Sequence, residues 1–279
     1  MIGFSLALVI IFGAITLLGF ELWRRNRRVW NELFETRRYL QEIRTTQTAA
    51  IKRITMLEIG QGFRLPARIP SQHGEDILLW NFFDRKLTGF YVEVGAYDGV
   101  GFSNSYFFEA IGWTGVLIEP VPAHAESCER ARPFSRVISA AAGKETGGKA
   151  DTLNIVNGPQ GVGTLSYLGH NSEQAERIAR EGGSAQIVDV AVVSLDQILA
   201  DHTGEIDFVS IDVEGRELDV LAGFDIARFR PRVLVIEDNS GGKDQRVSAW
   251  LSERGYDDRY RCEHNVFFVR RGELAEFHW

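Results

Sequence analysis

The sequence is poor in cysteine and carries no excess of positive charge. Its 279 residues include two cysteines, Cys128 and Cys262, too few for a disulfide scaffold, and no Cys/His spacing predicts a zinc site. The formal net charge is −7, so we expect no nucleic-acid partner. With 44% hydrophobic and 25% charged residues, the composition is that of a globular protein, which excludes wholesale disorder and collagen.

Charge is also absent from the first 20 residues, a run of apolar and small side chains that ends before Glu21. A helix of that length spans about 30 Å, the thickness of the hydrocarbon core of a bilayer. No Lys or Arg precedes this run and four arginines follow it over residues 24–28, the reverse of a cleaved signal peptide. We therefore predict an uncleaved transmembrane anchor over residues 1–23. The positive-inside rule then predicts a single-pass protein of the bacterial inner membrane, with its body in the cytoplasm.

Residues 24–58 form a basic segment with nine Lys or Arg against four Glu, and this segment contains neither Pro nor Gly. Heptad positions a and d are apolar at seven of nine places, which predicts a helical neck that forms a short coiled coil, and so a homodimer, through residues 29–57. A single amphipathic helix lying on the acidic body or on anionic lipid fits the same pattern. Glycines and prolines over residues 59–70 then end the helix and mark a linker.

From residue 71 to residue 279, apolar runs alternate with helical patterns, which predicts one doubly wound α/β domain. The predicted strands cover residues 90–94, 115–119, 136–140, 206–212, 232–237 and 266–269. The predicted helices cover residues 75–86, 103–111, 122–131, 214–222 and 244–254. Residues 142–195 fit this alternation less well, and we interpret them as an insertion with strands at 151–156 and 186–193 around a polar helix near 171–181.

The fingerprint G-x-G-x-x-G of dinucleotide-binding enzymes is missing after the first predicted strand, which makes a nicotinamide dehydrogenase a weak interpretation. The pattern there is E-x-G-x-x-D-G, formed by Glu93, Gly95, Asp98 and Gly99. In a doubly wound sheet, ligands bind beyond the carboxyl ends of the strands. Carboxylates at this place suit a ligand with an amino group better than a pyrophosphate, which they would repel.

Other predicted strands also end in carboxylates: Glu119 after the second, Asp212 and Glu214 after the fourth, and Glu237 after the fifth. Glu119 follows the glycine loop by about 20 residues, where an acid can accept both ribose hydroxyls of a nucleoside. Acidic strand ends without a basic phosphate clamp match S-adenosylmethionine, which carries a sulfonium, an ammonium and a ribose but no phosphate. The sequence therefore predicts S-adenosylmethionine as the cofactor.

A series of segments in order and spacing resembles the FkbM family of S-adenosylmethionine-dependent methyltransferases over residues 71–270. The segments include S-Q-H-G-E-D at 71–76, G-F-Y-V-E-V-G-A-Y-D-G at 89–99, S-N-S-Y at 103–106, I-E-P at 118–120 and I-D-F-V-S-I-D-V-E-G at 206–215. The resemblance implies the seven-stranded, Rossmann-like class I methyltransferase fold.

The resemblance also implies roles for single residues. The cofactor-binding residues that it implies are Ser71, Gln72, Glu93, Gly95, Asp98, Gly99, Asn104, Glu119 and Asp212. Asp212 would lie near the sulfonium or the acceptor, and Glu119 on the ribose. The usual Asp and Asn of the first-strand motif are Glu93 and Tyr97 here, so no role is carried over to Tyr97.

Methylation of a hydroxyl needs a base that removes the hydroxyl proton during attack. The candidate bases are Asp212, Glu214, Glu237 and His264, and we favour Asp212 or Glu214 because they end the strand nearest the methyl donor. Glu214 also opens a helix, where it would favour the helix dipole, and His264 fits a surface turn equally well. The set Asp212, Asp238 and Asn239 resembles a magnesium site of catechol-type O-methyltransferases, but the spacing is common and we predict no metal.

Together these features predict a membrane-anchored O-methyltransferase. Its acceptor would be a glycan, a lipid-linked molecule or another small molecule with a hydroxyl, because tethering brings the enzyme to substrates assembled at the membrane. The alternative is a non-catalytic adaptor or scaffold that binds S-adenosylmethionine in a membrane complex.

Overall fold

The computed structural model describes Thr36 and residues 69–144, 151–158, 161–162, 166–169, 176, 178–180 and 183–273. The predicted anchor and coiled coil lie outside these residues, except for Thr36. Within the described residues, no helix combines the length and the apolar character needed to cross a membrane. The chain divides into two compact units, Met1–Arg53 and Ile54–Trp279, and the second holds the domain described below.

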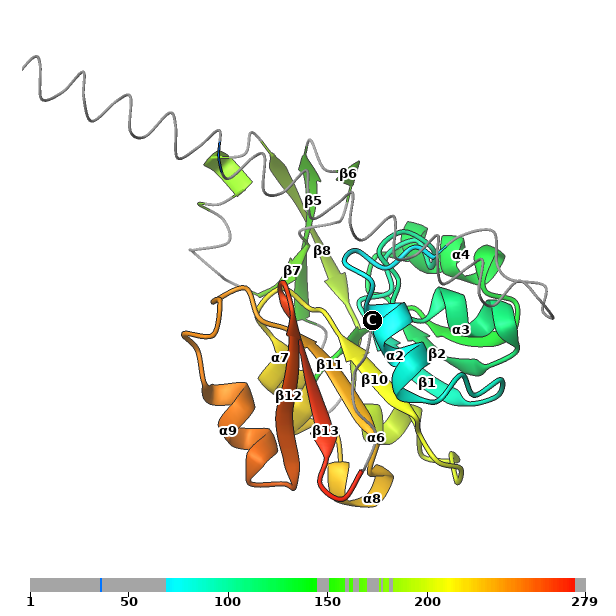
Figure 1. Ribbon diagram of the computed structural model, residues 1–279. Coiled ribbons are helices and arrows are strands. Elements are labelled where there is room, and N and C mark those ends of the chain that lie inside the picture. Colours follow the sequence, from blue (N-terminus) through cyan, green and yellow to red (C-terminus); the bar gives the residue numbers. More distant parts are fainter. Residues whose placement is uncertain are drawn as a thin grey trace, which may run out of the picture. The chain divides into compact units, whose positions relative to one another are not determined.

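A seven-stranded sheet forms the centre of this domain, in the order β12-β13-β11-β10-β1-β2-β3 (Figure 1). Its strands are β1 Phe90–Val94, β2 Thr114–Ile118, β3 Ser135–Ile138, β10 Phe208–Ile211, β11 Val233–Glu237, β12 Tyr256–Cys262 and β13 Asn265–Arg270. Neighbouring strands are parallel, except that β13 is antiparallel to both β11 and β12. The predicted seven-stranded, doubly wound sheet is thereby confirmed.

The central strands were easy to predict because both of their faces are buried. Strand β10 is buried at every residue, and β1 at all but its first, so their apolar runs are nearly continuous. Strand β12 was not predicted from the sequence. It lies at the sheet edge, and its sequence Y-D-D-R-Y-R-C is buried only at Tyr256 and Cys262. An edge strand of this kind contains no apolar run from which it could be predicted.

Helices cover both faces of the sheet and enclose two apolar cores. On one face lie α6 Leu195–Ile198, α7 Glu217–Ala222, α8 Ile226–Phe229 and α9 Arg246–Ser252, packed on a core that includes Val92 and Val94. On the other lie α2 Glu75–Phe82, α3 Tyr106–Ile111 and α4 Pro122–Ala131, packed on a core that includes Tyr91 and Phe208. Alternate residues of one strand therefore serve opposite faces. Helices α6 and α8 were not predicted, because four residues are too short for a helical period.

The predicted insertion forms a second sheet beside the first. Its strands are β5 Asp151–Gly158, β6 Gly161–Val162, β7 Tyr167–Leu168 and β8 Ser184–Val190, with β8, β6 and β7 all antiparallel to β5 (Figure 1). Strand β4 Ala141–Ala142 precedes this sheet in the sequence and β9 Val192–Val193 follows it, and the two strands form a short parallel pair. Leu153 and Val190 pack with Val121 and Ala141 in a small core, which joins the insertion to the end of β2.

Candidate functional site

The parallel register brings four strand ends into one row. Val94 of β1 pairs with Ile118 of β2 and Ile211 of β10, and Ile211 pairs with Ile236 of β11. The residues that follow these four are Gly95, Glu119, Asp212 and Glu237. Three carboxylates predicted from separate motifs are therefore neighbours at the carboxyl edge of the sheet.

Gly95 allows the first and fourth of these strand ends to approach each other closely. Its φ is +84°, and a Cβ atom there would lie 1.9 Å from the backbone oxygen of Asp212. No other residue combines this conformation with this contact at an acceptable cost. The predicted glycine is thus required by packing between β1 and β10, and it brings the backbone of Asp212 next to the first loop.

A pocket opens at this edge, and we call it the strand-end pocket. The predicted residues that line it are Glu93, Gly95, Asn104, Glu119, Asp212 and Glu214. Lining residues that were not predicted include Tyr97, Phe102, Ala141, Ala142, Leu153 and Ser166. The remaining predicted residues, among them Gln72, Asp98, Gly99, Glu237 and His264, are not part of this lining.

Glu119 is buried in the wall of the strand-end pocket with hydrogen-bonding capacity to spare. Its two oxygens accept hydrogen bonds from the backbone N–H groups of Tyr97 and Val121, each at 2.9 Å. An ionised carboxylate has about four acceptor positions. His124 Nδ1 also lies 3.8 Å from Oε1 of Glu119. The two backbone hydrogen bonds therefore leave about two acceptor positions on a residue that lines the pocket.

Glu93, by contrast, holds the neighbouring loop. Its oxygens accept hydrogen bonds from Ser103 Oγ at 2.8 Å, Asn104 N at 2.8 Å and Ser105 Oγ at 2.6 Å. Arg132, with 1% of its side chain exposed, lies 3.7 Å from Glu93 and donates to Ser105 Oγ at 2.7 Å. The acid of the first-strand motif therefore shapes the pocket wall through this buried network.

Asp98, like Glu93, accepts hydrogen bonds from a neighbouring loop. Its Oδ1 accepts hydrogen bonds from Val100 N at 2.9 Å and Gly101 N at 2.6 Å, which closes the turn after the first strand. Ser71 donates to Asp76 and forms a backbone bridge with Phe102, a residue of the pocket lining, while Gln72 is exposed. The segment around Ser71 thus supports the pocket wall without lining it.

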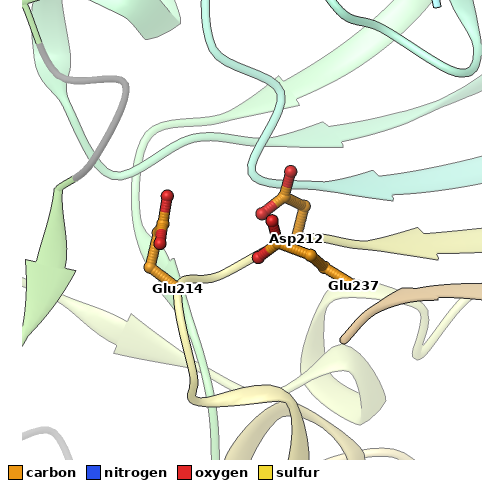
Figure 2. A group of neighbouring side chains, drawn as sticks. All are labelled: Asp212, Glu214 and Glu237. Carbon is orange, nitrogen blue, oxygen red and sulfur yellow. The ribbon is translucent and has the colours of Figure 1, made fainter. Parts of the chain in front are cut away.

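Three carboxyl groups cluster at the ends of β10 and β11, where Figure 2 shows Asp212 and Glu237 side by side with Glu214 farther along the loop. Oxygens of the three lie within 4.8 Å of one another. Burial, followed by the charges of Asp212 and Glu214, raises the pKa of Glu237 to about 10. Asp212 keeps solvent access through the pocket, yet protein atoms surround its carboxyl, and this burial is the largest cause of its raised pKa.

The set Asp212, Asp238 and Asn239 does not come together as a magnesium site would require. Asp238 accepts hydrogen bonds from Ser240 N at 2.9 Å and Gly242 N at 2.8 Å, and pairs with Arg261 at 2.6 Å. Its carboxyl is therefore engaged in the loop after β11.

His264 lies in the turn between β12 and β13, and it is exposed as the surface-turn interpretation expects. Strand β13 is antiparallel to β11, with Asn265 opposite Glu237, so the turn reaches the same edge of the sheet as the carboxylates. His264 acts on the carboxyl of Asp212, whose pKa it lowers against the dominant effect of burial. The turn therefore adds a basic group beside the acidic cluster.

Two aromatic residues of the pocket lining had no signal in the sequence. Tyr97 and Phe102 have φ values of +51° and +61°, a left-handed conformation that costs energy for residues with bulky side chains. Phe102 is 59% exposed, and its ring centroid lies 6.4 Å from that of Tyr97. Leu153 and Ser166 come from the insertion, where no motif was readable, so only the folded chain identifies them.

The family model described as the methyltransferase FkbM domain matches residues 93–257. No curated protein sequence matches the chain.

Solved structures of similar fold include a TehB-like SAM-dependent methyltransferase from Corynebacterium glutamicum, with 13% identity over 81% of this chain and 98% of that one, at a TM-score of 0.38. A precorrin-6y C5,15-methyltransferase from Geobacter metallireducens has 12% identity over 75% and 92%, at a TM-score of 0.37. An O-methyltransferase from Bacillus cereus in complex with SAH has 13% identity over 77% and 87%, at a TM-score of 0.36.

Proposed function

Because the chain belongs to the FkbM methyltransferase family, we propose that the strand-end pocket binds S-adenosylmethionine and that the protein methylates a hydroxyl group. The acceptor in this proposal is a glycan, a lipid-linked molecule or another small molecule. The observation that carries the proposal is the pocket at the carboxyl edge of the sheet, where ligands of doubly wound folds bind.

The residues of the strand-end pocket fit this cofactor. Glu119 has acceptor positions left for ribose hydroxyls, and Ala141, Ala142 and Leu153 offer an apolar wall beside it for a base. Asp212 offers a negative charge toward a cation. Among the described residues of the lining there is no Lys or Arg, so the pocket has no clamp for a phosphate. This balance suits a cationic nucleoside without phosphate.

Bound there, S-adenosylmethionine would supply an electrophilic methyl group on its sulfonium. Within this proposal Asp212 is the base, because it directly follows β10, lines the pocket and keeps solvent access. It would accept the proton that an acceptor hydroxyl loses during attack, a contribution of about 10²–10⁴-fold in rate. The pocket walls would align donor and acceptor, which contributes about 7–11 kcal/mol.

Binding is tested by titration calorimetry of the full-length protein with S-adenosylmethionine. We expect Glu119→Gln to weaken binding by about tenfold or more, because hydrogen bonds to a charged carboxylate are lost. The matched control is Glu126→Gln on α4, whose side chain is 71% exposed, and it should bind as the wild type does. If the wild type does not bind S-adenosylmethionine, the proposed function fails.

Turnover is tested with radiolabelled S-adenosylmethionine and a membrane extract. At saturating S-adenosylmethionine, Asp212→Asn should lower the rate by about 10²–10⁴-fold. The same change should weaken binding of S-adenosylmethionine, because it removes negative charge from the pocket lining. Tight binding by the wild type with no turnover on any extract, together with co-purification of a fixed partner, would favour the adaptor over the enzyme.

We extend the proposal to the N-terminal part of the chain from its sequence. The uncharged run before Glu21 and the arginines after it support an anchor in the inner membrane with the catalytic domain in the cytoplasm. The apolar heptad positions over residues 29–57 support a homodimer. Mass measurement of the full-length protein by light scattering in detergent tests the dimer, and a monomer there would reject it.

A further inference from the structure

Asp212 and Glu237 follow paired residues of neighbouring strands, Ile211 and Ile236, and oxygens of their carboxyl groups lie within 4.8 Å of each other. An ionised carboxylate is only an acceptor of hydrogen bonds. Two ionised carboxylates therefore cannot hydrogen-bond to each other and repel at this distance, which favours a proton on one of them. Figure 2 shows the carboxyl groups of Asp212 and Glu237 side by side, the arrangement in which one shared proton relieves the repulsion.

The two members of this pair differ in their surroundings. Oε2 of Glu237 is sealed from solvent and receives no hydrogen bond from any N–H or O–H group of the described chain. Asp212 reaches the strand-end pocket and its solvent. Glu237 is therefore the better place for the proton, and Asp212 is the member that a ligand in the pocket can contact.

The charges around the pair disfavour a second negative charge. Glu237 faces the acidic groups of Asp212, Glu214 and Glu217. Asp212 faces Glu93 and Glu75 on the acidic side and His264 on the basic side. With so much negative charge nearby, one proton on the pair is favoured over two negative charges.

We propose that Glu237 is a positioning residue that holds a proton against Asp212, and that a cationic ligand in the strand-end pocket expels this proton to solvent. The O–H bond of Glu237 breaks, the proton passes to water or buffer, and both carboxyls are left ionised beside the cation. Asp212 is then a free base only when the methyl donor is bound. The inference rests on the proposed function for the identity of that cation, S-adenosylmethionine.

The experiment counts protons released on binding. Full-length protein is titrated with S-adenosylmethionine at pH 7.5 in buffers of different ionisation enthalpy. The slope of the observed binding enthalpy against the ionisation enthalpy of the buffer gives the number of protons released on binding. The comparison ligand is S-adenosylhomocysteine, which has the same amino group but no sulfonium charge. We expect S-adenosylmethionine to release about one proton more than S-adenosylhomocysteine.

Two variants locate the proton. Glu237→Gln, which cannot release one, should bind S-adenosylmethionine with the difference between the two ligands abolished. Glu126→Gln, on the exposed face of α4, should retain the full difference. Equal proton release for both ligands in the wild type, or an unchanged difference in Glu237→Gln, overturns the inference while S-adenosylmethionine still binds. Absence of binding by the wild type overturns the proposed function instead.

A second measurement needs no variant and covers the case in which Glu237→Gln fails to fold. The infrared spectrum of the wild type at pH 7.5 should contain the carbonyl band of a protonated carboxyl, and S-adenosylmethionine should remove it. A band that persists at full occupancy, or a ligand-free spectrum without such a band, overturns the inference.

Discussion

Single residues decide how the strand-end pocket is built, and Gly95 has the least freedom among them. Its positive φ and the position of the Asp212 backbone oxygen leave no room for a side chain. The contact joins the end of β1 to the end of β10. A change at this residue therefore disturbs the loop after β1 and the position of Asp212 together.

We expect Gly95→Ala to lower the free energy of unfolding by about 3 kcal/mol or more, since it adds backbone strain and a steric clash. Binding of S-adenosylmethionine should be lost with it. Gly204→Ala is the matched control, because Gly204 is exposed, its φ is not positive, and its nearest neighbour is a His202 ring atom at 3.4 Å. The control should remain within about 0.5 kcal/mol of the wild type in urea denaturation. Similar stabilities for the two variants would contradict this account.

Glu237 makes stability depend on pH. Burial and then the charge of Asp212 raise its pKa from 4.5 to about 10. Between these values the unfolded chain loses a proton that the folded chain keeps, so the free energy of unfolding falls as pH rises. Glu237→Gln removes this term. Relative to the wild type, its melting temperature should increase progressively from pH 5 to pH 8, as measured by scanning calorimetry. A difference independent of pH would show that Glu237 titrates normally.

At the scale of elements, α4 holds the loops of β1 through Arg132, the residue after its last turn. Arg132 donates to Glu109 at 3.0 Å and to the Gly99 carbonyl at 2.9 Å, and lies near Glu93. Arg132 thereby places a positive charge beside the buried acids Glu109 and Glu93, and it attaches the turn after β1 to the helix. Removing one member of such a network leaves the others buried without compensation.

Arg132→Met should cost about 3–5 kcal/mol of stability, because Glu93 and Glu109 would stay buried without their positive partner. Arg130→Met on the same helix is the control, since that side chain is 69% exposed and its ion pair with Glu126 is long, at 3.9 Å. It should change stability by less than about 1 kcal/mol in chemical denaturation. Equal losses in both variants would indicate that the network around Arg132 contributes nothing specific.

The insertion is the other element that bears on the site, because Leu153 of β5 belongs both to the small core with Val121 and to the pocket lining. Leu153→Ala should cost about 2–5 kcal/mol through the cavity that it leaves, and should weaken binding of S-adenosylmethionine. Ile187→Ala on β8 is the control, since Ile187 is 67% exposed. Unchanged binding in Leu153→Ala would mean that the insertion does not contribute to the cofactor site.

At the scale of the whole molecule, charge divides the chain into an uncharged start, a basic segment over 24–58 and an acidic remainder. The proposed anchor predicts that the full-length protein sediments with membranes and resists alkaline washing. Val9→Lys with Phe12→Lys should release it, because each lysine at a helix centre costs about 2.5–3.5 kcal/mol on insertion. The control Ile187→Lys, at an exposed residue of β8, should leave the protein bound to the membrane. Recovery of the wild type in the soluble fraction would reject the anchor.

Much of this domain could be predicted from residues in sequence. The prediction for β1 coincides with the strand, and β2, β3, β10, β11 and β13 were placed within a few residues. All of these except β3 are largely buried, and a buried strand is an apolar run in the sequence. Glu119 and Asp212 were found for a related reason: residues that end parallel strands meet at one edge. Strand β12 was missed because an exposed edge strand has no such pattern.

The pairing of side chains could not be predicted in the same way. Asp238 and Glu237 are adjacent in sequence, yet Glu237 meets Asp212 while Asp238 closes its own loop with Arg261. Side chains alternate along a strand, so a shift of one residue decides which of them faces Asp212. Glu93 was predicted to bind the cofactor, but its oxygens accept hydrogen bonds from three groups of the loop 103–105.

The sequence by itself determined the doubly wound sheet and the strand ends that carry acids, because both depend on patterns within short stretches of chain. Only the tertiary structure decided that the carboxyl groups of Asp212 and Glu237 come together, that Arg132 neutralises buried acids, and that Leu153 reaches the pocket. These contacts join residues far apart in the chain. Their geometry depends on strand register and packing, which no local pattern encodes.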